Sequence, residues 1–176
     1  MVEVVENGSL HQIKREGDSR EFPDAELRNI ESAIKQVPDT AFEDSELDDE
    51  VTIFDAVMAD GLPEYEYEGP NENNPECQLW RDEFFHSVDL YHPEKRIAIE
   101  VEKSERKYIW KDLAKFSRGG KTYKSRREKI EFGCLVVPVN YSGGGNIFQG
   151  AMKILDFMRP MLFVEDVAVI GYREPR

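Results

Sequence analysis

The sequence predicts an α/β protein with a central mixed β-sheet flanked by α-helices. The segment after Pro23 carries apolar residues at helical spacing, namely Leu27, Ile30, Ile34 and Val37. A nearly continuous apolar run, IEFGCLVVPV at 130–139, is typical of a strand buried on both faces. Segments 78–90 and 96–103 have the composition of paired strands joined by a turn. Helices and strands in this order pack as layers of helix on sheet.

Length and composition limit the organisation of the chain. The 176 residues fit one domain, and 40% hydrophobic residues with 11% aromatics are enough for one core. No apolar run approaches the roughly 20 residues that a membrane span needs, and the acidic N-terminus does not have a signal-peptide pattern. Cys77 and Cys134 form no CxxC pair, so neither a zinc site nor a disulfide scaffold is indicated. We expect a single cytoplasmic domain over 1–176.

The N-terminal half is predicted to hold two helices between polar segments. Residues 1–22 lack strong periodicity and are expected to form an extended arm. A helix should begin at Pro23 and end at Pro38. The remaining segments are interpreted as a loop at 39–50, a short helix at 51–58 and a long turn-rich loop at 64–76.

The C-terminal half is predicted to supply the sheet. A helix at 108–118 should end at Gly119–Gly120. A second helix should run from an Asn146 cap to Pro160. Strands are expected at 78–90, 96–103, 130–139 and 167–170.

Charge is distributed unevenly along the chain. The net charge is −13, which by itself argues against a nucleic-acid binder. Residues 91–129, however, hold 13 Lys and Arg against 6 Asp and Glu, a local balance of +7. The other residues hold 10 basic and 30 acidic side chains, a balance of −20. This asymmetry indicates a polyanion-binding face on an otherwise acidic surface.

Three acidic residues are expected to lie together beside the strand pair. Alternation along 96–103 places Glu100 and Glu102 on one face, and the opposite face is apolar: Ile97, Ile99 and Val101. Asp89 lies one hairpin away. Carboxylates brought together repel one another unless a cation neutralises them, and oxygen ligands favour Mg²⁺ or Mn²⁺ over zinc. Such an ion can activate water and polarise a phosphodiester. Alternatively, Glu100 and Glu102 are the solvated face of an edge strand.

The register of this hairpin raises a difficulty. With a five-residue turn at 91–95, Asp89 would face Ile97 rather than Glu100. The site would then require splayed or bulged strands. Alternation also sends Lys103 to the apolar face, away from the acids.

This block resembles the PD-(D/E)xK nuclease superfamily, whose signature is an acid ending one strand and an acid-x-Lys on the next. It is more narrowly similar to the BglII- and BamHI-type restriction endonucleases, in which Glu or Gln replaces that lysine. Asp89 is the first acid, Glu100 is the second, and Glu102 stands at the lysine position. The similarity covers roughly 78–140 and includes KDLAKF, which is like the helix after the catalytic strand. Val88 stands where a proline normally precedes the first acid.

The resemblance implies a restriction-endonuclease-like core and a Mg²⁺-dependent endodeoxyribonuclease, with Mn²⁺ as a substitute. Asp89, Glu100 and the Val101 carbonyl would bind the metal, and Glu102 would orient or activate the attacking water. The first expectation is a type II restriction endonuclease that cuts double-stranded DNA and can have a partner methyltransferase. Two alternatives stay open: a structure-specific repair or recombination nuclease, and a nuclease-like domain that binds nucleic acid or protein without cutting.

Basic residues that follow the acids are candidates for DNA phosphate contacts. Aromatic residues are interleaved with them, and the alternative is a solvated loop without a partner. The candidates are Arg106, Lys107, Lys111, Lys115, Arg118, Lys121, Lys124 and Arg126.

A homodimer is also expected. One domain carries one site, whereas cutting both strands of a duplex needs two. The helix residues Met152, Leu155, Phe157 and Met158 are candidates for the interface or for the core.

Overall fold

The computed structural model describes residues 2–13, 19–42, 47–69, 74–79, 86–102, 106–121, 129–140 and 145–175. Its strands are β1 (Glu3–Ser9), β2 (Glu66–Tyr67), β3 (Leu90–His92), β4 (Ile97–Val101), β5 (Phe132–Pro138) and β6 (Asp166–Arg173). Its α-helices are α1 (Leu10–Ile13), α2 (Asp24–Gln36), α3 (Leu47–Gly61), α4 (Arg106–Gly120) and α5 (Ile147–Met158). Short 3-10 helices follow at Asp39–Phe42 and Arg159–Met161.

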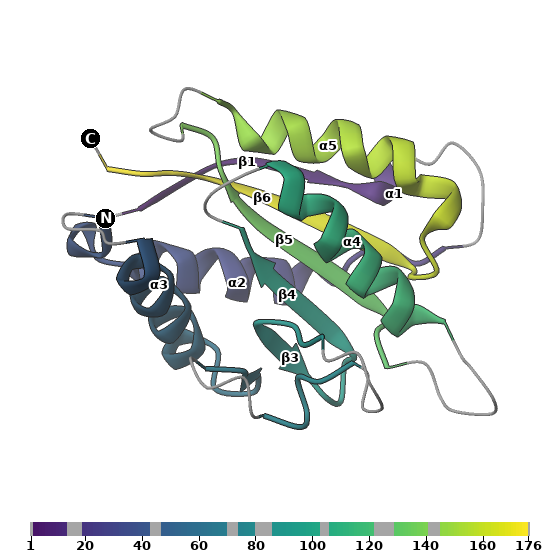
Figure 1. Cartoon of the computed structure of the whole chain (residues 1–176), viewed down its shortest axis with the longest axis horizontal. Coiled ribbons are helices and arrows are strands. Elements are labelled where there is room, and N and C mark those ends of the chain that lie inside the picture. Colours follow the sequence, from purple (N-terminus) through teal and green to yellow (C-terminus); the bar gives the residue numbers. More distant parts are fainter. Residues whose placement is uncertain are drawn as a thin grey trace.

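One six-stranded mixed sheet organises the molecule, with strand order β1-β6-β5-β4-β3-β2 (Figure 1). Strands β4, β5 and β6 are parallel neighbours. The α4 helix connects β4 to β5, and α5 connects β5 to β6, as parallel neighbours require. The other neighbouring pairs are antiparallel. The predicted α/β fold class and the restriction-endonuclease-like core are confirmed.

The sheet separates two hydrophobic cores (Figure 1). On one face, Ile97 and Ile99 pack in a cluster with residues of α2 and α3 such as Ile30 and Phe54. On the other face, Ala98 belongs to the cluster that α4 and α5 cover. The alternation predicted along β4 is therefore confirmed. All seven residues of β5 are buried, as the continuous apolar run predicted.

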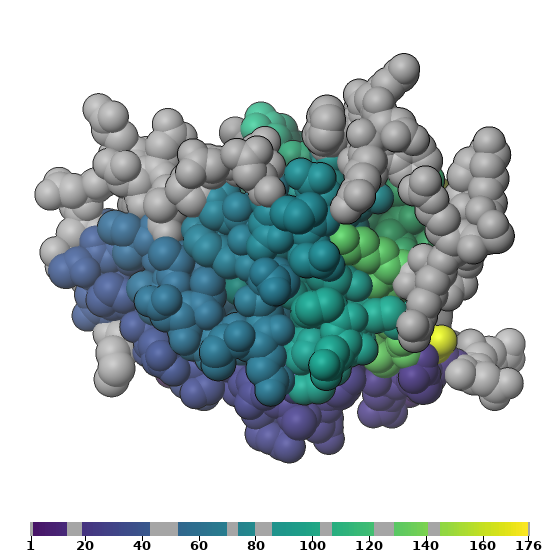
Figure 2. All heavy atoms as spheres, turned by 90° about the horizontal axis from the view of Figure 1, so that it is seen from below, coloured from purple at the N-terminus to yellow at the C-terminus, as the bar shows by residue number. Residues whose placement is uncertain are grey.

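The face covered by α2 and α3 forms a continuous surface. Figure 2 shows it with α2 in violet and blue beside the blue-to-teal residues of α3 and of the segment 62–69. The helix predicted after Pro23 is confirmed as α2, whose Ile30 and Ile34 are buried. The predicted Asn146 cap of α5 is confirmed as well, since its side chain accepts a hydrogen bond from the Gln149 N–H.

Three predictions for the N-terminal half are wrong. The segment expected to be an extended or partly ordered arm instead contains regular structure at 3–13, where β1 pairs with β6 as an edge strand and α1 follows it. The segment 39–50 contains a 3-10 helix and the first turn of α3 instead of a continuous loop. Within 64–76, β2 adds a short edge strand to β3. The strands β1 and β2 each pair with a strand that is distant in sequence, which local periodicity does not report.

The strand predicted at 78–90 is much shorter. Gln78 and Ser87 form an isolated bridge, and β3 begins only at Leu90. Residues 80–85 lie outside the described part of the chain. In the described part, no helix is long and apolar enough to span a membrane.

Candidate functional site

The register of β3 and β4 places Asp89 beside Glu100. Leu90 pairs with Ile99 and His92 pairs with Ile97, so four residues, 93–96, form the turn. Arg96 closes this turn in the left-handed region, with φ 54°. Asp89, which precedes Leu90, therefore lies next to Glu100, which follows Ile99. The predicted need for splayed or bulged strands is wrong, because the shorter turn already supplies the required register.

A backbone contact holds Asp89 in this position. Its Oδ2 atom accepts a hydrogen bond from the N–H of Val101 at 2.7 Å. Val101 directly follows Glu100, so the contact fixes the first acid next to the second. Asp89 and Glu100, which the sequence separates by a hairpin, are thus brought together as predicted.

Glu100 projects from β4 towards α4 and is only 4% exposed. The Nζ atom of Lys115 lies 2.7 Å from its Oε1 and 2.8 Å from its Oε2. Burial, and next the nearby Asp89 charge, raise the pKa of Glu100 well above its usual value, although Lys115 opposes the shift. Both oxygens of the second predicted metal ligand therefore bind an ammonium group.

Asp112 is a further acid at the site that was not predicted. It is 4% exposed, and its Oδ1 lies 3.6 Å from the Lys115 Nζ. Burial raises the pKa of Asp112 to about 6, with Glu102 and Asp89 contributing in the same direction against the lowering by Lys115. Asp112 and Lys115 share one side of α4 because they are three residues apart. That spacing in KDLAKF was the available sequence signal.

Close packing of α4 on the sheet positions these side chains. Ile109, Leu113 and Phe116 are fully buried beneath the helix. A Cβ on Gly133 of β5 would lie 2.5 Å from the Phe116 ring, so a glycine is required for α4 to approach this closely. Lys115 is held over Glu100 as a result.

Glu102 lies just beyond β4. Its backbone N–H donates to the Val136 carbonyl at 3.0 Å, and its side chain is half-buried. The Glu102 charge contributes to the raised pKa of Asp112. Val101, the third predicted metal ligand, is buried next to Asp89.

The chemistry of these donors fits a hard divalent cation, because carboxylate oxygens are the ligands that Mg²⁺ prefers. Among the residues that the structure describes, however, no three His, Cys, Asp or Glu side chains are arranged to hold a metal ion. The arrangement instead has two adjacent acids, Asp89 and Glu100, and a lysine ammonium bound to the second. An ion that used Glu100 would have to share or replace the Lys115 contact.

Comparison with family models decides the assignment. A model described as "Putative halobacteria restriction endonuclease" matches residues 2–172. The chain belongs to this family. No curated protein and no solved structure gives a significant match. The predicted resemblance to restriction endonucleases is confirmed at the level of this family, whereas the narrower resemblance to the PD-(D/E)xK superfamily and its BglII- and BamHI-type members stays a prediction.

In this family member, α4 carries most of the described basic candidates. Lys107, Lys111, Arg118 and Lys121 are exposed. Lys121 lies over the Phe163 ring, with its Nζ 4.3 Å from the centroid. Lys115 differs from them, because its side chain is 9% exposed and is paired with Glu100. Lys124 and Arg126 lie outside the described residues, and the Arg106 side chain lies outside the described side chains.

The predicted interface residues of the family member divide between core and surface. Leu155 and Met158 are buried in the core on the α4 and α5 side, and Met152 packs against that core. Phe157 is 67% exposed, and its ring packs edge-on against Trp110 of α4. Of the four candidates, Phe157 is the one whose side chain is exposed.

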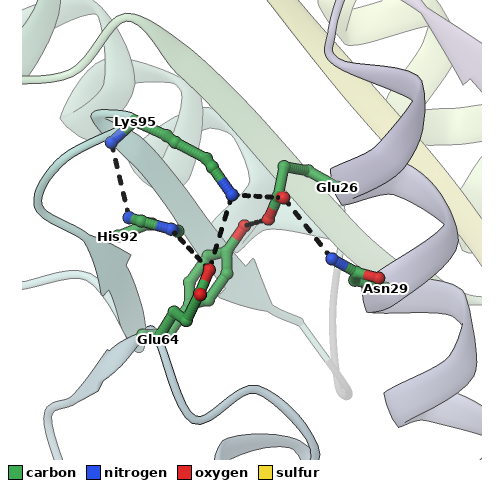
Figure 3. A network of polar contacts seen from close by, with 6 residues as sticks. Glu26, Asn29, Glu64, His92 and Lys95 are labelled. Carbon is green, nitrogen blue, oxygen red and sulfur yellow. Dashed lines mark hydrogen bonds and ion pairs between the residues drawn. The ribbon is translucent and has the colours of Figure 1, made fainter.

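A second polar cluster holds the β3–β4 turn on the opposite face (Figure 3). Lys95 of the turn places its Nζ 2.7 Å from Glu26 of α2 and 3.5 Å from Glu64. His92 contacts Glu64 at 3.3 Å. The buried Glu26 also accepts a hydrogen bond from the Tyr65 hydroxyl at 2.9 Å. The cluster ties the turn that sets the Asp89 register to α2.

Proposed function

We propose that this protein is a Mg²⁺-dependent endonuclease that hydrolyses DNA phosphodiester bonds, and specifically a type II restriction endonuclease. The observation that carries the proposal is the pairing of Asp89 with Glu100 beside β4 in a chain of this family. These residue types, one hairpin apart, form the acidic pair that a phosphodiester-cleaving metal site requires.

The proposed roles of the residues are those that the resemblance to the PD-(D/E)xK nucleases implies. Asp89, Glu100 and the Val101 carbonyl would hold the ion, and Glu102 would orient the attacking water. When bound, Mg²⁺ supplies water activation and stabilisation of charge on the phosphodiester, and Mn²⁺ can replace it. The Asp89 charge helps to raise the pKa of the buried Glu100, and a divalent cation would offset this repulsion.

Double-stranded DNA is the proposed substrate. The exposed cations of α4 lie on the same helix as Lys115, beside the acids. Phosphate contacts of this kind give affinity and position without reading sequence. Arg106, Lys124 and Arg126 stay in the proposed contact set.

We propose a symmetric homodimer as the active form, because two sites related by a two-fold axis match the two strands of a palindromic target. The exposed Phe157 and Trp110 are candidates for the contact between the two chains. A partner methyltransferase that protects the host sites would complete the restriction system.

Cleavage of a mixed-sequence plasmid library, followed by sequencing of the ends, tests the proposal. The reaction is run with Mg²⁺ or with EDTA, over a range of KCl concentrations. Ends at one short sequence on unmethylated duplex, produced only with Mg²⁺, are expected. A preference for branched DNA would support the repair nuclease instead, and DNA binding without metal-dependent cleavage would support the non-cutting domain.

A further inference from the structure

We propose that Lys115 is a built-in counterion that competes with the divalent metal for Glu100. Metal binding then requires the ammonium group to leave the carboxylate, so Lys115 limits the metal affinity of the site. This inference rests on the proposed function, because it takes Glu100 to be a metal ligand.

The contact engages the atoms that a metal would use. The Lys115 Nζ lies 2.7 Å from one carboxylate oxygen of Glu100 and 2.8 Å from the other. The two side chains are 9% and 5% exposed, so water screens the interaction weakly. A divalent ion and the Lys115 ammonium group cannot both bind the two carboxylate oxygens of Glu100 at these positions.

The surrounding charges favour a resident cation. Asp112 lies 3.6 Å from the ammonium group, and Asp89 is held beside Glu100 by its hydrogen bond from the Val101 N–H. Buried acids of like charge destabilise one another, and one ammonium group offsets part of that repulsion. If the ammonium group is removed, a divalent ion can offset the same repulsion.

The side chain can also move without displacing its helix. The backbone of α4 is held by Phe116 against Gly133 and by the buried Leu113. Lysine carries its charge on a flexible four-carbon stem with freely rotating donors. The ammonium can therefore leave Glu100 while α4 stays packed on the sheet.

A purely structural ion pair makes the opposite prediction. If Lys115 only stabilised the site, its loss would disorder Glu100, and metal affinity would fall or stay unchanged. If Lys115 competes with the metal, its loss should tighten metal binding. The sign of the change in metal affinity separates the two roles.

Calorimetric titration of the EDTA-treated full chain with Mn²⁺ provides the test. Lys115→Met should bind Mn²⁺ at least about tenfold more tightly than the wild type, which corresponds to about 1.4 kcal/mol. Lys115→Arg keeps the charge and should stay near the wild-type affinity. Lys153→Met removes an exposed lysine from α5 and serves as the matched control. Mn²⁺ should also raise the Tm of Lys115→Met more than that of the wild type.

The outcomes separate this inference from the proposed function. Unchanged or weaker Mn²⁺ binding by Lys115→Met, with binding lost in Glu100→Gln, would overturn the counterion role and leave the metal site standing. Absence of Mn²⁺ binding in both the wild type and Lys115→Met, with no cleavage, would overturn both. If Lys115→Met does not fold, Lys115→Gln carries the same prediction with a polar side chain.

Discussion

The Asp89 carboxylate accepts a hydrogen bond from the Val101 backbone N–H at 2.7 Å. This contact joins the residue before β3 to the last residue of β4 and sets the first acid beside Glu100. It has a consequence for mutagenesis, because an asparagine at position 89 can still accept the same hydrogen bond through its amide oxygen. The Asp89→Asn variant can therefore remove the charge of this residue while keeping its position.

Removing the charge of either acid should abolish cleavage without unfolding the protein. Glu100→Gln and Asp89→Asn keep size and hydrogen-bonding capacity but lose the charge that would hold the metal. We expect DNA cleavage to fall by on the order of 10³-fold or more, because water activation and charge stabilisation are lost together. Plasmid nicking in Mg²⁺ measures the effect.

Glu102→Gln is the matched comparison for these variants. Relatives in the group that the sequence resembles carry Gln at this position, so this variant should retain activity. A gel shift in Ca²⁺ should show that all three variants still bind DNA. Full cleavage by Glu100→Gln would remove Glu100 from the site.

Asp112 should make stability depend on pH. Burial raises the pKa of Asp112 to about 6 from an ordinary value of 3.8. Between these values the folded state keeps a proton that the unfolded state has lost, so stability falls as pH rises from about 4 to 6 and stays lower above that. The contribution is at most about 3 kcal/mol.

Asp112→Asn should remove this contribution. The stability of the variant relative to the wild type should be higher at pH 7 than at pH 4, as measured by urea unfolding without metal. The raised pKa of Glu100 acts in the same direction, but burial and Asp89 are its two main raising causes and both proteins retain them. A difference between the two proteins that does not change with pH would show that folding does not raise the pKa of Asp112.

The exposed lysines on α4 and directly after it should contribute to the salt dependence of DNA binding. The double change Lys111→Gln and Lys121→Gln removes two candidate phosphate contacts. The slope of log K against log[salt] should become shallower by about 2 units, because each contact contributes about 0.9. Binding should weaken on every DNA sequence alike, since phosphate contacts carry no sequence information.

Two lysines outside α4 provide the control for this measurement. Lys35→Gln on α2 with Lys153→Gln on α5 changes the net charge equally, and both side chains are exposed. The slope should then stay at its wild-type value. Equal slopes in the Lys111 and Lys121 double variant and in the control would show that neither lysine contacts the DNA backbone.

The cluster of Figure 3 should stabilise the fold from the opposite face of the sheet. Lys95→Met leaves Glu26, which is 3% exposed, without its 2.7 Å ammonium partner. Tyr65 still donates to Glu26, and Lys95 is 43% exposed, so we expect a moderate loss of about 1–2 kcal/mol. Urea unfolding measures it, with Lys153→Met as the control. A loss equal to that of the control would mean that solvent already satisfies Glu26.

The sequence by itself determined the elements whose patterns are local. Helical spacing after Pro23 predicted α2, and a continuous apolar run predicted the buried β5. Alternation along β4 put Glu100 on the face opposite to Ile97 and Ile99, because side chains in a strand point to opposite faces in turn. These features depend on neighbouring residues only.

Only the tertiary structure decided the rest. Glu3–Ser9 forms β1 because β6, more than 150 residues further along the chain, offers its edge as a partner. The left-handed Arg96 shortens the turn and sets the register that places Asp89 beside Glu100. The pairing of Lys115 with Glu100 requires α4 to pack across the sheet. Each is a contact between segments that only the folded chain brings together, so no local pattern contains it.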